Sequence, residues 1–80
     1  MDDRQLVERI EALVAEEHRI EQSHVNEGLS AEETTRLRSL EIALDQCWDL
    51  LRQRRARRNV GEDPDSAEVR PPEVVERYRQ

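Results

Sequence analysis

The sequence predicts an all-α protein, an antiparallel two-helix hairpin of coiled-coil type followed by a flexible C-terminal tail. Three observations support this fold class: two stretches with apolar residues three and four positions apart, a short break around Asn26 and Gly28, and a polar, proline-containing end. Apolar residues at this spacing line one side of a helix. A short loop between two such helices favours antiparallel packing. We therefore expect a hairpin over residues 1–60 and a polar linker and tail over residues 61–80.

The first helix is expected over about residues 3–24. Its apolar seam consists of Leu6, Ile10, Leu13 and Ile20, with Val7 and Val14 beside it. This spacing is typical of helices that pack lengthwise against a second helix. Asp2 or Asp3 can cap the start of the helix, because a carboxylate accepts hydrogen bonds from the free amides of the first turn.

The second helix is expected over residues 31–59. Ser30 and Glu33 form a capping-box pattern, in which each side chain bonds the backbone amide of the other residue. The seam of this helix consists of Leu37, Leu40, Leu44, Cys47 and Leu51, and Trp48 and Leu50 flank it on opposite sides. Gly61 and Pro64 are typical helix-ending residues. The second helix is the longer one, so its last turns should extend beyond the first helix.

The last twenty residues have a different character. Residues 61–66 are polar and are expected to form a mobile linker. A short helix is predicted over residues 72–78, because proline is favoured in a first helical turn. So short a helix is unstable alone in water, and it should become ordered only by docking on the hairpin or on a partner.

Composition limits the classes of protein to which the chain can belong. It has 80 residues, of which 40% are charged, one cysteine, one tryptophan and one tyrosine. A domain of this size buries a modest core and is marginally stable unless something reinforces it. A single cysteine forms no internal disulfide, so self-association is expected, with a dimer favoured. The first residues lack a signal-peptide pattern, and no apolar run approaches the roughly 20 residues that cross a bilayer. We expect a cytoplasmic protein without membrane contact.

Charge is unevenly distributed along the chain. Residues 1–51 carry a net charge of −8, residues 52–58 one of +5, and residues 59–80 one of −3. The basic run consists of Arg52, Arg54, Arg55, Arg57 and Arg58. Such a run can bind nucleic-acid phosphates. The alternative is internal compensation, because Asp2 and Asp3 should lie beside the run and three acidic residues follow it. We favour the alternative.

Two further groups could carry chemistry. Glu17, Glu21 and His24 share one side of the first helix and are the candidate metal ligands, although this spacing is common on solvated helices. Glu17 also occupies a seam position, where Arg36 or Arg38 is its expected ion-pair partner. Cys47 lies on the second seam and is expected to behave as a small apolar residue.

Three stretches carry a resemblance to a known family. Residues 44–58, LDQCWDLLRQRRARR, together with residues 13–18 and 70–76, resemble a family of short actinobacterial proteins, domain-of-unknown-function family 2630. The resemblance covers most of the chain. Because that family has no established activity, it implies no cofactor, partner or site residue for this sequence.

The expected function is that of a small non-enzymatic interaction or adaptor protein. No nucleophile–base pair, phosphate-binding loop or specific metal-ligand set is present, and no cofactor is expected. The expected interaction residues are those that widen the apolar stripe beyond the seams: Val7, Val14, Trp48 and Leu50. The expected partner is a second copy, a larger protein, or both. Nucleic-acid binding through the arginine run and metal binding by the first helix are the alternative functions.

Overall fold

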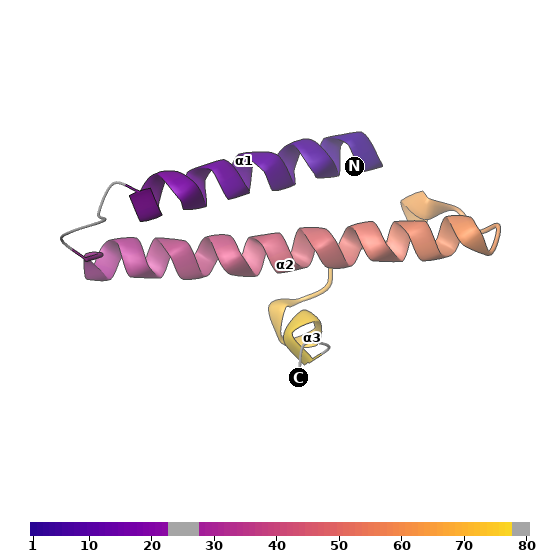
Figure 1. Ribbon diagram of the computed structural model, residues 1–80. Coiled ribbons are helices and arrows are strands. Elements are labelled where there is room, and N and C mark those ends of the chain that lie inside the picture. Colours follow the sequence, from indigo (N-terminus) through magenta and orange to yellow (C-terminus); the bar gives the residue numbers. More distant parts are fainter. Residues whose placement is uncertain (23–27, 78–80) are drawn as a thin grey trace.

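The computed structural model describes residues 1–22 and 28–77. These residues form helices α1 (Asp3–Gln22), α2 (Ala31–Asn59) and α3 (Pro72–Arg77), with a short 3-10 helix, η1 (Pro64–Ser66), between α2 and α3. The described part of the chain is therefore all-helical, as predicted. Figure 1 shows α1 lying along α2, with α3 on the other side of α2.

The molecule is elongated because α2 sets its length. Its principal extents are 51 × 26 × 16 Å. A helix rises about 1.5 Å per residue, so the 29 residues of α2 account for about 43 Å of the long dimension. Among the residues that the structure describes, none of the helices combines the length and the apolar composition needed to span a lipid bilayer.

Both helix starts are capped as the sequence predicts. At α1, the Asp2 carboxylate accepts a hydrogen bond of 2.8 Å from the amide of Gln5, and the Asp2 amide donates one of 2.9 Å to the Gln5 side chain. At α2, the Ser30 hydroxyl accepts from the Glu33 amide at 3.1 Å and the Ser30 amide donates to the Glu33 carboxylate at 3.0 Å. These bonds satisfy amides that lack a partner within the helix.

The end of α2 is a Schellman motif built on Gly61. The Gly61 amide donates to the carbonyl of Arg58 and the Glu62 amide to that of Arg57. Gly61 has a φ of +80°, a left-handed conformation that glycine adopts without a steric penalty. Gly28, before α2, has a φ of +71°. Residues 25–27 of the predicted break, and residues 23–24 of the predicted first helix, lie outside the described residues.

The hydrophobic core lies along the α1–α2 contact. Its buried members come mostly from the two predicted seams: Leu6, Ile10, Leu13, Leu40, Leu44, Leu50 and Leu51. Ile20, Leu37 and Cys47 are partly buried against this cluster. The predicted seam residues therefore form the core, and Leu50, predicted to flank the seam and to contact a partner, is buried with them.

Ion pairs show which ends of the two long helices lie side by side. Near the start of α1, Asp3 pairs with Arg54 and Arg58 in the last turns of α2, at 2.7 Å in each case. Near the end of α1, Glu16 pairs with Arg36 in the second turn of α2, also at 2.7 Å. The sequence analysis predicted that Arg36 or Arg38 pairs with Glu17. In the structure, Arg36 pairs with Glu16 instead. Glu17 is the next residue along α1 and points about 100° further around the helix, so the Arg36 guanidinium reaches Glu16 and not Glu17.

The segment after α2 is docked, which corrects the prediction of a flexible tail. It turns back along α2, and both η1 and α3 contact that helix. Val75 of α3 is 2% exposed, and Ala67 packs against the hydrophobic core. The helix predicted over residues 72–78 is present as α3; Tyr78 lies outside the described residues. The tail is ordered because α2 supplies the docking surface that a short helix requires.

Candidate interaction surface

A polar stripe on α2 holds the returning tail. Gln46 donates from its side-chain amide to the carbonyl of Arg70 at 3.2 Å, and Gln53 donates to the carbonyl of Glu68 at 2.9 Å. Asp49 lies between the two glutamines, and the spacing of three and then four residues puts all three on one side of the helix. Glu68 and Arg70 are therefore held to α2 through their backbone carbonyls.

Asp49 is the centre of this stripe. It is 2% exposed and accepts two hydrogen bonds from the Arg70 guanidinium, of which the Nε bond to Oδ2 is 2.8 Å. Gln53 donates a third bond to the same carboxylate at 2.9 Å. The Arg70 guanidinium lowers the pKa of Asp49, with a smaller contribution from Gln53, and together they outweigh the opposing effect of burial. A buried carboxylate is stable here because it is ionised and paired.

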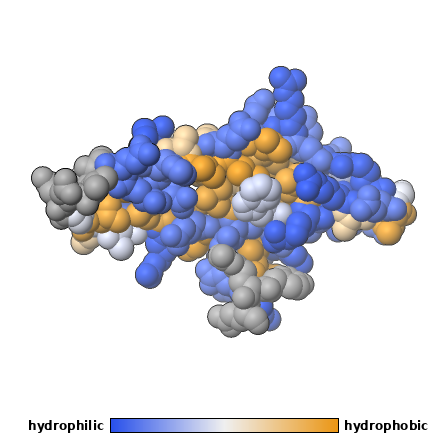
Figure 2. Space-filling view, in the orientation of Figure 1, coloured by the Kyte–Doolittle hydropathy of each residue, from blue (hydrophilic) through white to orange (hydrophobic). Residues whose placement is uncertain are grey.

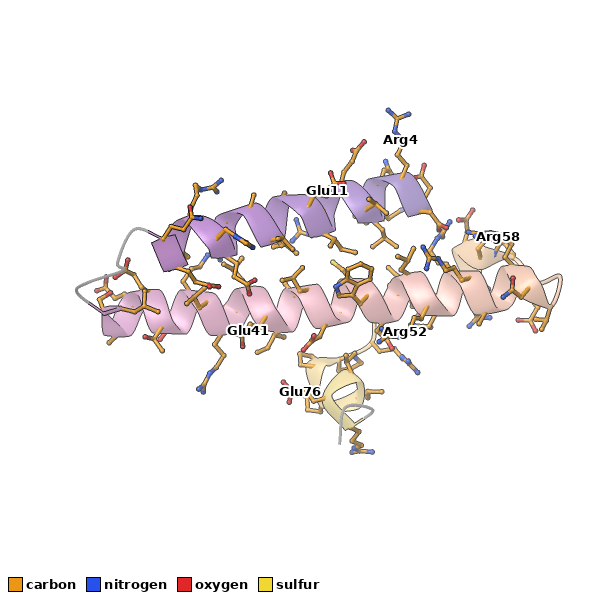
Figure 3. The ribbon with its side chains drawn as sticks, in the orientation of Figure 1. Arg4, Glu11, Glu41, Arg52, Arg58 and Glu76 are labelled. Atoms are coloured by element: carbon orange, nitrogen blue, oxygen red, sulfur yellow. The ribbon has the colours of Figure 1, made fainter. Side chains whose placement is uncertain are left out.

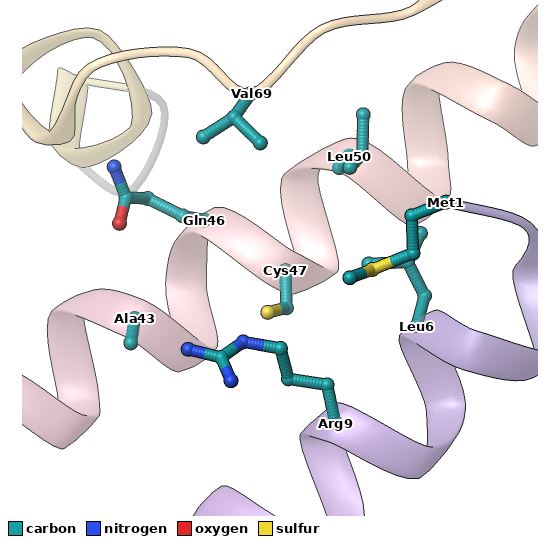
Figure 4. Close-up of a pocket in the computed structure, with 8 residues that line it drawn as sticks. All are labelled: Met1, Leu6, Arg9, Ala43, Gln46, Cys47, Leu50 and Val69. Carbon is teal, nitrogen blue, oxygen red and sulfur yellow. The ribbon is translucent and has the colours of Figure 1, made fainter. Parts of the chain in front are cut away.

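Leu50 lies where the α1–α2 core meets the tail. It is 6% exposed and lines a cavity of about 210 Å³ that also contacts Leu6 and Val69. Figure 4 shows Val69 of the tail placed over Leu50 and Cys47 of α2. Leu50, one of the predicted interaction residues, is therefore buried in the single chain between α1 and the tail.

Cys47 lies in the same cavity and faces Arg9 of α1 (Figure 4). Burial raises the pKa of the Cys47 thiol, and the nearby Arg9 guanidinium opposes this shift only in part. A thiol with a raised pKa is a poor nucleophile at neutral pH. Cys47 is partly buried against the core, as predicted.

Arg54 joins three parts of the chain. Its Nε donates to Asp3 at 2.7 Å, and its Nη1 donates to the carbonyl of Pro64 at 3.2 Å and to Asp65 at 2.9 Å. Arg54 is 5% exposed. Arg54, one of the candidate nucleic-acid contacts, is therefore buried, with its guanidinium paired to carboxylates of α1 and η1. The same bond, with one from Arg58, lowers the pKa of Asp3.

Of the other four arginines in the run, two form ion pairs and two are exposed to solvent on α2. Arg57 pairs with Glu62 at 3.3 Å, and Arg58 pairs with Asp3. Arg52 and Arg55 are exposed on α2. The predicted compensation by acidic neighbours thus holds for three of the five arginines, Arg54 included.

An apolar face remains open on the side of α2 away from Leu50. Trp48 is 45% exposed and Val7 is 40% exposed, while Val14 is half-buried. Trp48 and Leu50 point to opposite sides because two residues correspond to about 200° around a helix. Figure 2 shows an apolar area near the middle of the molecule, over the junction of α1 and α2, with hydrophilic areas around it. We call Val7, Val14 and Trp48 the Trp48 face.

The rim of the Trp48 face is charged. Acidic side chains lie at one end, where Glu17, Glu41 and Asp45 line a shallow groove with Leu44 and Trp48. The basic residues Arg52 and Arg55 follow Trp48 by four and seven positions on α2, which places them on the same side of the helix. Figure 3 labels Glu41 and Arg52 at separate positions along α2. An apolar centre with a charged rim is the usual composition of a protein interface.

The metal hypothesis gains no support from the described residues. Glu17 is half-buried beside the groove and Glu21 is exposed, whereas His24 lies outside the described residues. Within residues 1–22 and 28–77, no group of three histidine, cysteine, aspartate or glutamate side chains is arranged to hold a metal ion.

Comparison with known proteins identifies the family of the chain. The family described as "Protein of unknown function (DUF2630)" matches residues 2–80. The chain belongs to this family. Uncharacterized proteins of Mycobacterium tuberculosis and Mycobacterium bovis are each 51% identical to it over 77 residues, covering 95% of this chain and 88% of the relative. No solved structure matches the chain significantly.

The structure explains much of the sequence on which the family resemblance was based. Within residues 46–55, Gln46, Asp49 and Gln53 hold the tail, and Arg54 binds α1 and η1. Sequence reasoning missed this tail-binding stripe. A signal was present, because three polar residues three and four apart interrupt a leucine-rich segment, but the sequence did not reveal Arg70 as their partner.

Proposed function

We propose that this DUF2630 chain is a small non-enzymatic interaction protein that presents the Trp48 face to a protein partner. In this proposal α1 and α2 form an antiparallel, coiled-coil-like hairpin that supports the face rigidly. The observation that carries the proposal is the exposure of the chain's single tryptophan, 45% exposed next to apolar residues of both helices. Tryptophan is enriched among the residues that dominate binding energy at protein interfaces.

The docked tail strengthens this argument. The tail covers the opposite flank of α2, where Leu50 and the Asp49 carboxylate would otherwise meet water. The chain thus encloses one apolar flank with its own residues and leaves the other uncovered. A contiguous exposed apolar patch with a polar rim is typical of an interaction site.

The test is affinity capture with the intact tagged chain as bait, comparing wild type with Trp48→Ser. The matched control is Val60→Ser, because Val60 is 71% exposed at the end of α2, away from the Trp48 face. We expect proteins bound by the wild type, including untagged copies of the chain, to be retained by the control and lost from Trp48→Ser. Circular dichroism verifies that both variants fold. Equal capture by Trp48→Ser and wild type, or no specific capture by either, refutes the proposal.

A further inference from the structure

We propose that the occupant of the Trp48 face is a second copy of this chain, bound with the two α2 helices antiparallel across a two-fold axis at Trp48. This inference rests on the proposed function and adds the identity of the partner and the register of the contact. It is carried by the order of charges along the exposed side of α2.

The charges on α2 are arranged symmetrically with opposite signs about Trp48. Glu41 precedes Trp48 by seven residues, and Arg55 follows it by seven. Seven residues are close to two helical turns, so both side chains lie on nearly the same side of α2 as Trp48. Both are exposed in the single chain.

A two-fold axis at Trp48 converts this arrangement into two ion pairs. When two copies of α2 pack antiparallel, each position a given number of residues after Trp48 faces the position the same number before it. Arg55 of one copy then faces Glu41 of the other, twice by symmetry. The pairs lie about 10 Å on either side of the axis, at 1.5 Å of rise per residue. Parallel packing of α2 would instead place Glu41 against Glu41 and Arg55 against Arg55.

Apolar residues fill the centre between the two ion pairs. Trp48 lies on the axis, and the aliphatic stem of Arg52 lies beside it, four residues along α2. Val7 and Val14 of α1 widen the contact, so that four helices surround it. Arginine stems cover apolar surface while their charged ends stay in water. The two-fold arrangement therefore buries the indole and places Glu41 and Arg55 beside opposite charges.

The decisive experiment is a charge swap across the predicted pair. Sedimentation of Glu41→Arg, Arg55→Glu and the double variant is compared with wild type over a range of concentrations at about 0.15 M salt, where the Debye length is about 8 Å. Each single reversal creates like-charge contacts at both symmetric positions, so we expect the dimer dissociation constant to rise roughly tenfold or more. The double variant restores opposite charges and is expected to return to near the wild-type value.

Matched controls carry the same charge changes outside the face. Glu8→Arg and Arg19→Glu alter two exposed residues of α1, eleven positions apart and therefore on one side, turned away from Val7 and Val14. Both controls should dimerise like wild type. Trp48 provides a second readout, because its fluorescence emission should shift to shorter wavelength as the dimer forms. If a reversal disturbs folding by circular dichroism, Glu41→Gln and Arg55→Gln replace it, with a smaller weakening expected.

The outcomes separate this inference from the proposed function. A chain that stays monomeric at every concentration, single reversals that behave like the controls, or a double variant that is not restored each overturn the second-copy geometry. The same holds for a dimer whose formation leaves Trp48 emission unchanged. If Trp48-dependent capture of a different protein persists in these cases, the proposed function stands and only the identity of the partner is wrong.

Discussion

Replacing Asp49 by Asn tests whether the tail is held by a charge-assisted contact. The substitution preserves the size of the side chain but removes the charge that accepts two hydrogen bonds from Arg70 and one from Gln53. A hydrogen bond to a charged group contributes about 1.5–3 kcal/mol. The Arg70 side chain is 34% exposed, so solvent screening reduces this contribution. We expect Asp49→Asn to lower the free energy of unfolding by about 1–2 kcal/mol.

Chemical and thermal unfolding followed by circular dichroism measures this change. For a chain of this size 1 kcal/mol corresponds to about 4–8 °C, so we expect the Tm to fall by about 5–15 °C. Hydrogen exchange should localise the loss to residues 66–77. The double variant with Arg70→Gln should be little worse than either single variant, because both remove the same contact.

The control for this prediction is Glu11→Gln, which removes one negative charge from an exposed position of α1. It should leave both stability and tail exchange unchanged. An Asp49→Asn variant as stable as this control, or one whose effect adds fully to that of Arg70→Gln, would show that the ion pair does not hold the tail.

Three further predictions follow from the same contacts. Asp3 and Asp49 have lowered pKa values in the folded state, so their contribution to stability is complete above about pH 4–5 and is lost as the pH falls through the folded pKa values. Urea unfolding across pH 2–7 should show this loss of stability. The double variant Asp3→Asn, Asp49→Asn should lose less stability over the same pH range. Leu50→Ala should lower the free energy of unfolding by about 2–5 kcal/mol because it leaves a cavity in the core. Val60→Ala, at an exposed position, should change that free energy by less than about 0.5 kcal/mol. Equal effects of the two variants in denaturant titrations would contradict the burial of Leu50. Cys47 should react with a thiol reagent at pH 7–8 more slowly than a free cysteine does and reach the free rate in urea, and a native rate equal to the free rate would argue against its burial under the tail.

Local sequence patterns were sufficient to predict the helices, their ends and the apolar seams. These features depend on residues close together in the chain: Ser30 and Glu33 are three apart, and the Schellman motif spans Arg57–Glu62. Seam spacing follows from the helical repeat alone. Local hydrogen bonds and periodicity could therefore be predicted without knowledge of the tertiary fold. The compensation of the arginine run was also expected, since the hairpin register brings Asp3 to it.

Tertiary structure alone decided which side of α2 stays open. Gln53 binds the backbone 15 residues later and Asp49 binds Arg70 21 residues later, and nothing in the local pattern names these partners. Leu50 is buried between α1 and the tail and Trp48 is exposed, although both flank the seam in the sequence. The physical reason is that a helix pattern specifies only the direction of each side chain, whereas burial depends on which distant segment packs against it.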